Sequence, residues 1–143
     1  MSEKKANVHW EGGGRNGKGQ ISTETDALKA YPYGFASRFE DDRRGTNPEE
    51  LLGAAHAACF SMALAAGLAQ AGHSPKSIAT TATVHLDKVG SGFAITGITL
   101  DTTADVPGVD DAVLNRFAEE TKSGCIISKA LASVPMTVKV TRA

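Results

Sequence analysis

The sequence predicts an α+β fold, and the order of its segments is the main reason. Short strand-like segments come first, then one long apolar helix, then two alternating segments joined by Gly90-Ser91-Gly92, an amphipathic helix and a last alternating segment. This order favours helices on one side of largely antiparallel sheets. A chain of 143 residues without a visible repeat or linker suits one domain, so we predict a single domain over residues 1–143.

The first third of the chain reads as short strands. Residues 7–11 and 19–25 favour strands, and residues 12–17 between them are rich in glycine and other turn residues. We expect a further strand over residues 34–40, where two phenylalanines are set apart by polar residues. A charged loop then leads to the long helix.

The long helix is predicted over residues 48–71. Asn47 suits the N-cap, Pro48 suits the first helical position, and Glu49 and Glu50 suit the positive end of the helix dipole. The helix is apolar nearly all round, so most of its faces should be buried. Because a monomer this small cannot easily surround such a helix, we expect a homodimer whose sheets enclose two paired helices across a large apolar interface.

The second half of the chain predicts two strands, two helices and a final strand. Residues 78–89 and 93–106 form the clearest hairpin, with a glycine-containing turn between them. Residues 110–122 have one apolar face and read as a helix. A short helix over residues 126–132 and a strand over residues 134–142 complete the prediction.

Composition excludes several classes of protein. The formal net charge is −1 and no block of Lys and Arg occurs, which argues against a nucleic-acid or anionic-membrane binder. The only candidate membrane span, residues 51–71, consists largely of Ala and Gly and includes His56, Ser61 and Gln70, so we expect no membrane span. With no apolar signal region at the N-terminus, we expect a cytoplasmic protein.

Two cysteines are the candidate reactive groups. In a reducing compartment they are expected as thiols, or as a transient redox pair, rather than as a structural disulfide. Cys59 lies on a mostly apolar helix face, so it is either a small core residue or a protected nucleophile that needs a cation beside it. His56, one turn away, Arg15 and Arg38 are the candidate cations. Cys125 follows Gly124 at a break between helices, where it is either a loop cysteine or a reactive thiol that pairs with Cys59.

The remaining polar residues leave further alternatives open. Glu50 is placed to close a capping box, which leaves Glu49 freer to orient an arginine. The four histidines show no zinc spacing, and the glycine-rich residues 12–17 lack the Gly-Lys-Ser/Thr ending of a phosphate loop. We therefore expect no metal and no cofactor. His56 and Cys59 as a Cys-His hydrolase pair are a poor arrangement, because a base should approach from another element.

Several segments together resemble one protein family over essentially the whole chain. The chain is similar to the osmotically inducible OsmC branch of the OsmC/Ohr family of organic hydroperoxide reductases. The segments that carry this resemblance are His9-Trp10-Glu11-Gly12, Gly17-Lys18-Gly19, Pro32-Tyr33-Gly34-Phe35, residues 46–62, residues 86–95 and Gly124-Cys125.

The resemblance implies an OsmC-like fold, an intertwined homodimer and a thiol peroxidase. Cys59 matches the peroxidatic cysteine of the family, and Cys125 matches the resolving cysteine. Glu49 matches the glutamate that holds the arginine of the site. We favour Arg38 as that arginine and keep Arg15, in a Gly-Gly-Arg segment like that of the Ohr branch, as second choice. The chain departs from the family in having Ile126 where proline commonly follows the resolving cysteine.

The expected reaction is the reduction of organic hydroperoxides, and more weakly of hydrogen peroxide, to alcohols in oxidative or osmotic stress defence. It would pass through a Cys59 sulfenate and a Cys59–Cys125 disulfide, which an external dithiol, such as a dihydrolipoyl protein, reduces. An apolar wall favours organic substrates; the candidate wall residues are Phe39, Leu51, Leu52, Phe60 and Met62. The alternative is a non-catalytic, stress-related dimer that binds apolar ligands.

Overall fold

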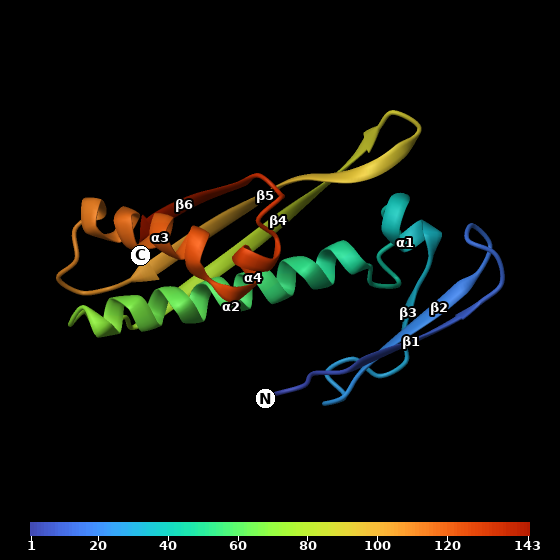
Figure 1. Ribbon diagram of the computed structural model, residues 1–143, viewed down its shortest axis with the longest axis horizontal. Helices are drawn as coiled ribbons and strands as arrows, with labels where there is room; N and C mark the ends of the chain where they lie inside the picture. Colours follow the sequence, from blue (N-terminus) through green and yellow to red (C-terminus); the bar gives the residue numbers. More distant parts are fainter. The chain divides into compact units, whose positions relative to one another are not determined.

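The structure is a computed structural model that describes all residues from 1 to 143 (Figure 1). The contacts within the chain divide it into two compact units, Met1–Leu51 and Leu52–Ala143, which we call the first and the second unit and describe separately. One helix, α2 (Pro48–Gln70), begins in the first unit and continues through the second. The expectation of a single domain over residues 1–143 stays a prediction.

The first unit is a three-stranded antiparallel sheet in the order β1-β2-β3, followed by a short helix. Its elements are β1 (Ala6–Glu11), β2 (Lys18–Thr23), β3 (Tyr31–Tyr33) and α1 (Phe35–Phe39). Gly19 of β2 pairs with Trp10 on one side and with Tyr33 on the other. The two aromatic rings lie over this glycine with centroids 5.4 Å apart, so any larger side chain at position 19 would collide with both.

The expected strand over residues 34–40 is wrong, because these residues form helix α1 and the strand β3 precedes them. Phe35 and Phe39 are four residues apart, which is the spacing of neighbours on one helix face, and their ring centroids lie 5.0 Å apart. Ser37 closes the first turn, since its hydroxyl accepts from the Gly34 amide at 3.0 Å and donates to the Thr46 carbonyl at 2.8 Å. Local hydrogen bonding therefore overrides the apparent alternation.

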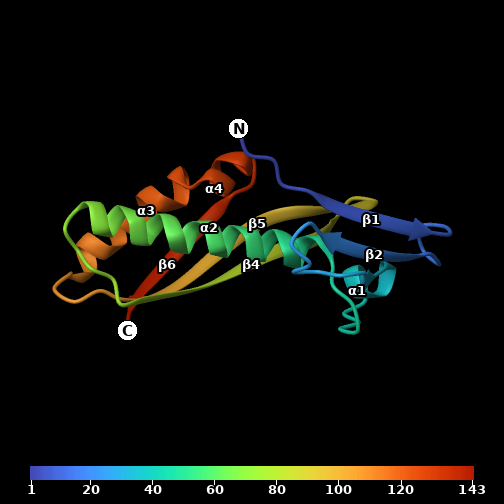
Figure 2. The same cartoon turned by 90° about the horizontal axis from the view of Figure 1, so that it is seen from below.

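The second unit packs helices on one face of a three-stranded sheet, as Figures 1 and 2 show. The sheet order is β4-β5-β6, and the elements are β4 (Ser77–Val89), β5 (Gly92–Asp105), α3 (Asp111–Gly124), α4 (Ile126–Ala130) and β6 (Met136–Arg142). Phe60 and Leu64 of α2, Leu100 of β5 and Leu114 of α3 form the centre of one buried apolar cluster. The α+β class is thus confirmed.

The second sheet is mixed, although the two sheets together are largely antiparallel, as the sequence predicts. β4 and β5 form the predicted antiparallel hairpin, with an irregularity between His85 and Leu86. β6 instead runs parallel to β5. The physical reason is the connection between them: α3 and α4 carry the chain back along the sheet, and such a crossover returns the next strand in the same direction.

Helix α2 is long and apolar enough to cross a membrane by length and composition, with a mean hydropathy of 1.7 in its most apolar stretch. One such helix is weak evidence, because the core helix of a globular protein passes the same test. Only 28% of that stretch is buried within the chain. An exposed stripe of small residues with one methionine remains on the helix, formed by Ala55, Ala58, Met62 and Ala66.

Candidate active site

Arg38 and Glu49 form a bidentate ion pair in the first unit. Arg38 Nη2 donates to Glu49 Oε1 at 2.7 Å, and Arg38 Nε donates to Oε1 and Oε2 at 3.0 and 3.2 Å. The Glu49 side chain is only 9% exposed, whereas that of Arg38 is 40% exposed. The carboxylate is therefore occupied by the guanidinium, and part of the guanidinium remains free to meet another group.

The start of α2 holds this pair in position. Asn47 is the N-cap: its Oδ1 accepts from the Glu50 amide at 2.7 Å, as the sequence predicts. Its Nδ2 donates to the Ser37 carbonyl at 3.1 Å, which ties α1 to the first turn of α2. Glu50 accepts instead from the Thr46 hydroxyl at 2.6 Å. Glu50 is thus occupied locally, and Glu49 is the carboxylate that meets an arginine.

Arg15, the second-choice arginine, is placed differently. Its guanidinium lies 4.7 Å from the centroid of the Phe35 ring, and its ion-pair partner is Glu40 at 4.0 Å. Its side chain is 74% exposed. The structure therefore pairs Glu49 with Arg38 rather than with Arg15.

The two cysteines belong to the second unit, and both are free thiols. Cys59 is partly exposed in the middle of α2, and Cys125 is buried at the junction of α3 and α4. Cys125 is a member of the apolar core cluster, and Cys59 packs against that cluster. The structure thus brings Arg38 together with Glu49 in one unit, and gathers both thiols at one apolar cluster in the other.

Cys125 also takes part in a buried polar network that sequence reasoning missed. Cys125 is the N-cap of α4, and its Sγ accepts from the Ser128 amide at 3.4 Å. The Ser128 hydroxyl lies 3.0 Å from Cys125 Sγ and 2.8 Å from His56 Nε2. The available signal was a serine three residues after Cys125, at N-cap spacing. Ser128 also bonds to His56 of α2, which is distant in the sequence, and no local pattern indicates this contact.

His56 faces this network rather than Cys59. Its side chain is fully buried, and its Nδ1 has no hydrogen-bond partner. Burial lowers the pKa of His56 from its usual value of 6.5, because a charged imidazolium loses its hydration there. At neutral pH the imidazole is therefore uncharged. Its Nε2 is engaged by Ser128, which disfavours the Cys-His hydrolase alternative at Cys59.

The candidate residues of the apolar wall differ in their exposure. Phe60 is fully buried in the core, so it is a packing residue. Met62 is 79% exposed on the stripe of α2. An apolar substrate or a second copy of the chain can therefore contact Met62 but not Phe60.

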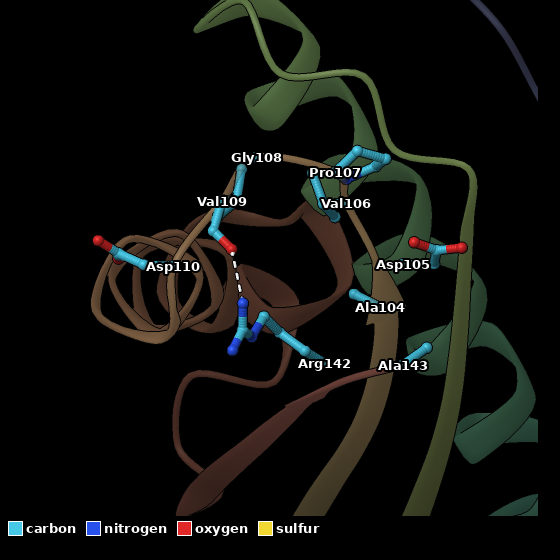
Figure 3. A pocket seen from close by; sticks show the side chains of 9 residues that line it. All are labelled: Ala104, Asp105, Val106, Pro107, Gly108, Val109, Asp110, Arg142 and Ala143. Atoms are coloured by element: carbon cyan, nitrogen blue, oxygen red, sulfur yellow. Dashed lines mark hydrogen bonds between the residues drawn. The ribbon is translucent and has the colours of Figure 1, made fainter.

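The pockets of the second unit lie beside, not over, these thiols. The pocket in Figure 3 has a volume of about 570 Å³ and is lined by residues 104–110, Arg142 and Ala143. Arg142 is fixed there by Asp111 at 2.7 Å and by the Val109 carbonyl. A second pocket, of about 450 Å³, has Ser128 in its wall together with Lys122 and Lys129. The second of these two pockets is the one whose wall includes Ser128, a hydrogen-bond partner of Cys125.

No group of three or more His, Cys, Asp or Glu side chains is arranged to hold a metal ion. The candidate groups are the Arg38–Glu49 pair in the first unit and, in the second unit, the two thiols with the polar network at Cys125. A guanidinium held by a carboxylate can stabilise an anion, and two thiols at one apolar cluster can exchange a disulfide.

The chain is similar to known proteins in sequence and in fold. A family model described as OsmC-like protein matches residues 40–140. The chain is 54% identical, over 90% of its length and 89% of the relative, to the peroxiredoxin OsmC of Escherichia coli. It is 32% identical, over 82% of its length and 80% of the relative, to an organic hydroperoxide resistance protein of Xanthomonas axonopodis.

A solved structure gives the same result for the fold. The organic hydroperoxide resistance protein OhrB of Bacillus subtilis matches with a TM-score of 0.75 and 26% sequence identity, covering 96% of this chain and 98% of its own. Family model, sequence identity and fold agree over most of the chain. The chain therefore belongs to the OsmC family.

Proposed function

We propose that this protein reduces organic hydroperoxides to alcohols with Cys59 as the reacting thiol and Cys125 as the resolving thiol. The protein is a peroxidase, on the basis of its 54% identity to a peroxiredoxin over 90% of its length. The relative named as an organic hydroperoxide resistance protein supports the substrate class. The observation that supports the pair of thiols is that Cys59 packs against the apolar cluster that contains Cys125.

In the proposed mechanism the Cys59 thiolate attacks the terminal oxygen of the hydroperoxide. The O–O bond breaks, the alkoxide takes a proton and leaves as an alcohol, and Cys59 becomes a sulfenic acid. The Cys125 sulfur then attacks the Cys59 sulfur, and the hydroxide that leaves is protonated to water. A dithiol of the solvent or of a partner protein reduces the disulfide and becomes a disulfide itself.

Arg38 is proposed to stabilise the thiolate of Cys59 and to donate hydrogen bonds to the peroxide oxygens. The bidentate pair with Glu49 supports this role, since it fixes the guanidinium plane and leaves part of it free. Donors fixed in advance stabilise developing negative charge without a cost of reorganisation at the moment of reaction.

We propose further that the protein is a homodimer and that the Arg38–Glu49 pair serves Cys59 of the second copy. Glu49 and Cys59 are ten residues apart on one helix, which separates them by about 15 Å along the axis and turns them about 80° apart around it. The exposed stripe on α2, with Met62 at 79% exposure, supports a second copy packed against this helix.

The cytoplasm stays the proposed compartment. Both cysteines are free thiols, which suits a reducing environment in which a dithiol renews the enzyme after each turnover.

The test is the consumption of cumene hydroperoxide in the presence of a dithiol by wild type, Cys59→Ser and Cys125→Ser. We expect turnover by wild type and none by Cys59→Ser. With one equivalent of peroxide and no dithiol, Cys125→Ser should stop at the sulfenic acid, which intact mass detects as one added oxygen. Turnover that survives in Cys59→Ser would overturn the proposal and favour a non-catalytic role for this thiol. Unchanged thiols in wild type after peroxide would favour the apolar-ligand alternative.

A further inference from the structure

We propose that Ser128 and His56 form a proton relay for the resolving thiol Cys125. The inference rests on the proposed function, because it concerns the step in which Cys125 attacks the oxidised Cys59. Ser128 touches the reacting sulfur directly. His56 acts through Ser128 and is therefore a positioning and proton-accepting residue rather than one that meets the substrate.

The geometry is a continuous chain of three polar atoms. Ser128 Oγ lies 3.0 Å from Cys125 Sγ and 2.8 Å from His56 Nε2, so one hydroxyl bridges the thiol and the imidazole. All three side chains are buried: His56 is 0% exposed, and Ser128 and Cys125 are each 3% exposed. A hydroxyl both donates and accepts, so Ser128 can accept the thiol proton while it donates its own to Nε2.

The site is built for this transfer rather than for packing alone. His56 lies in a helix that is otherwise composed mainly of Ala, Leu and Gly, and its Nδ1 remains without a partner in the core. A buried imidazole with one unpaired nitrogen costs free energy that an apolar side chain would not. The network is therefore better explained by its contact with Cys125 than by stability.

The proton balance of the step is closed. The S–H bond of Cys125 breaks, and its proton passes to Ser128 as the Ser128 proton passes to His56. The new S–S bond forms as the Cys59 sulfur releases hydroxide. His56 then gives up the proton that it accepted, and that proton converts the hydroxide to water, so His56 ends neutral. No oxidant or reductant beyond the sulfenic acid is needed. When the dithiol later breaks the disulfide, the same path returns a proton to the departing Cys125 sulfur.

Few charges surround the relay. Burial lowers the pKa of His56, so at neutral pH the imidazole is in the form that accepts a proton. Cys59 lies one turn further along α2. The pocket whose wall contains Ser128 has the ammonium groups of Lys122 and Lys129 beside it, and Lys122 is paired with Glu119 at 2.8 Å. The sheet presents uncharged side chains to the core cluster, among them Ala82, Val84, Ile98 and Leu100.

The experiment separates the two chemical steps in a single turnover. The reduced protein is mixed with one equivalent of cumene hydroperoxide, and rapid quenching followed by mass analysis gives the rate of sulfenic acid formation and the rate of disulfide formation. We expect Ser128→Ala and His56→Gln to form the sulfenic acid at the wild-type rate. Disulfide formation should slow about 10- to 100-fold at neutral pH, which is within the usual contribution of a positioned base.

The pH profile distinguishes a relay from a structural role. Without the relay, hydroxide in solution must deprotonate Cys125, so the resolving rate of His56→Gln should rise about tenfold per pH unit below the wild-type plateau. The resolving rate of wild type should vary much less between pH 6 and 8. A structural defect would slow the resolving step but would leave its dependence on pH the same as in wild type. Ser61→Ala, which removes a hydroxyl of the same helix bonded to Thr80, and His85→Gln, which removes an exposed histidine, are the matched controls.

The outcomes separate this inference from the proposed function. If wild type forms no sulfenic acid, the proposed function fails. If wild type forms and resolves the sulfenic acid but both variants resolve it within twofold of wild type with an unchanged pH slope, the relay alone is overturned.

A second measurement needs no peroxide. In a Cys59→Ser background, the reaction of Cys125 with 2,2′-dithiodipyridine reports the reactivity of that thiol directly. Adding His56→Gln should slow this reaction at neutral pH, and an unchanged rate would contradict the relay.

Discussion

At the scale of single residues, the proposed peroxide chemistry depends most directly on the Arg38–Glu49 pair. Arg38→Lys keeps the positive charge but loses the planar fork that holds both Glu49 oxygens. We expect the oxidation of Cys59 by cumene hydroperoxide to slow about 10- to 100-fold in this variant, because an ammonium cannot hold the same geometry. Stopped-flow measurement of the first turnover checks this.

Arg44→Lys is the matched control for that change. Arg44 makes the same bidentate contact, at 2.7 to 3.2 Å, with Asp42. Its hydrogen bonds lower the pKa of the partly exposed Asp42 carboxyl to about 2, which makes it an equally well-formed pair. A loss of rate in Arg44→Lys as large as in Arg38→Lys would show that the effect is not specific to the Glu49 pair.

His56 should also make stability depend on pH. Its pKa in the folded protein lies below the unfolded value near 6.5, because burial disfavours the charged form. Below pH 6.5 the unfolded chain therefore binds the proton first. The free energy of unfolding should be constant above about pH 7.5 and should fall as the pH decreases through 6.5, by about 1.4 kcal/mol for each unit between the two pKa values.

Urea denaturation at pH 7.5, 6.5 and 5.5 checks this dependence in wild type and in His56→Gln. The variant lacks the titrating group, so the difference in stability between the two proteins should shrink towards pH 5.5. A difference that stays constant over this range would contradict a depressed pKa at His56. His85→Gln, at an exposed position bonded to Thr99, should show the same dependence of stability on pH as wild type.

How much of the site the sequence predicts depends on whether its contacts are local. The Asn47 cap and the choice of Glu49 over Glu50 for an arginine follow from positions within one helical turn, and the structure has both. Arg38 could be ranked above Arg15 only through family resemblance, because the loop between α1 and α2 decides which guanidinium reaches Glu49. The contact between Ser128 and His56 could not be predicted, since the two residues are 72 positions apart in the chain.

At the scale of elements, the first sheet depends on one glycine. A Cβ at Gly19 would lie 2.6 Å from Trp10 Cε3 and closer still to Tyr33 Cε1, and neither ring is free to move because the two are packed together. Gly19→Ala should therefore destabilise the protein by about 1–3 kcal/mol through overpacking. Trp10 is the single tryptophan of the chain, so its fluorescence during denaturation reports on this sheet.

Gly14→Ala is the control for that prediction. A Cβ at Gly14 would meet no atom within 4 Å, so its denaturation midpoint should stay close to that of wild type. If Gly19→Ala unfolds at the same denaturant concentration as Gly14→Ala, the close approach of the two rings at β2 is not a constraint on the sheet.

The elements also show where sequence patterns succeed and fail. The boundaries of α2 and of the β4–β5 hairpin follow closely from caps, glycines and alternation, because these signals act within each segment. The strand predicted over residues 34–40 is wrong, because five residues of helix contain too little periodicity to distinguish a helix from a strand. The direction of β6 depends on the path of α3 and α4, which no property of β6 itself encodes.

At the scale of the whole molecule, the exposed stripe of α2 and the position of Arg38 lead to one arrangement. A helix with only 28% of its most apolar stretch buried needs a second surface. In the proposed homodimer, a second copy of the chain packs against this stripe. The Arg38–Glu49 pair of one copy then serves Cys59 of the other copy.

Mixing two inactive proteins tests this arrangement. Arg38→Ala keeps Cys59 but lacks the arginine, whereas Cys59→Ser keeps the arginine but lacks the thiol. If each site takes its arginine from the opposite copy, a heterodimer of the two has one intact site and one site that lacks both groups. After unfolding and refolding an equal mixture, half of the dimers are mixed, so peroxidase activity should return to about a quarter of the wild-type value.

An arginine that serves the thiol of its own chain predicts a different result. Each heterodimer would then contain two sites with one defect each, and the mixture would be as inactive as its components. Refolding Arg38→Ala with Glu49→Ala controls for activity gained by refolding alone. Both of these variants keep Cys59 and break the Arg38–Glu49 pair, so no pairing of the two chains restores an intact pair. Recovery in the first mixture and not in the second would locate the arginine on the partner. Only a mixed dimer can combine the thiol of the Arg38→Ala chain with the arginine of the Cys59→Ser chain.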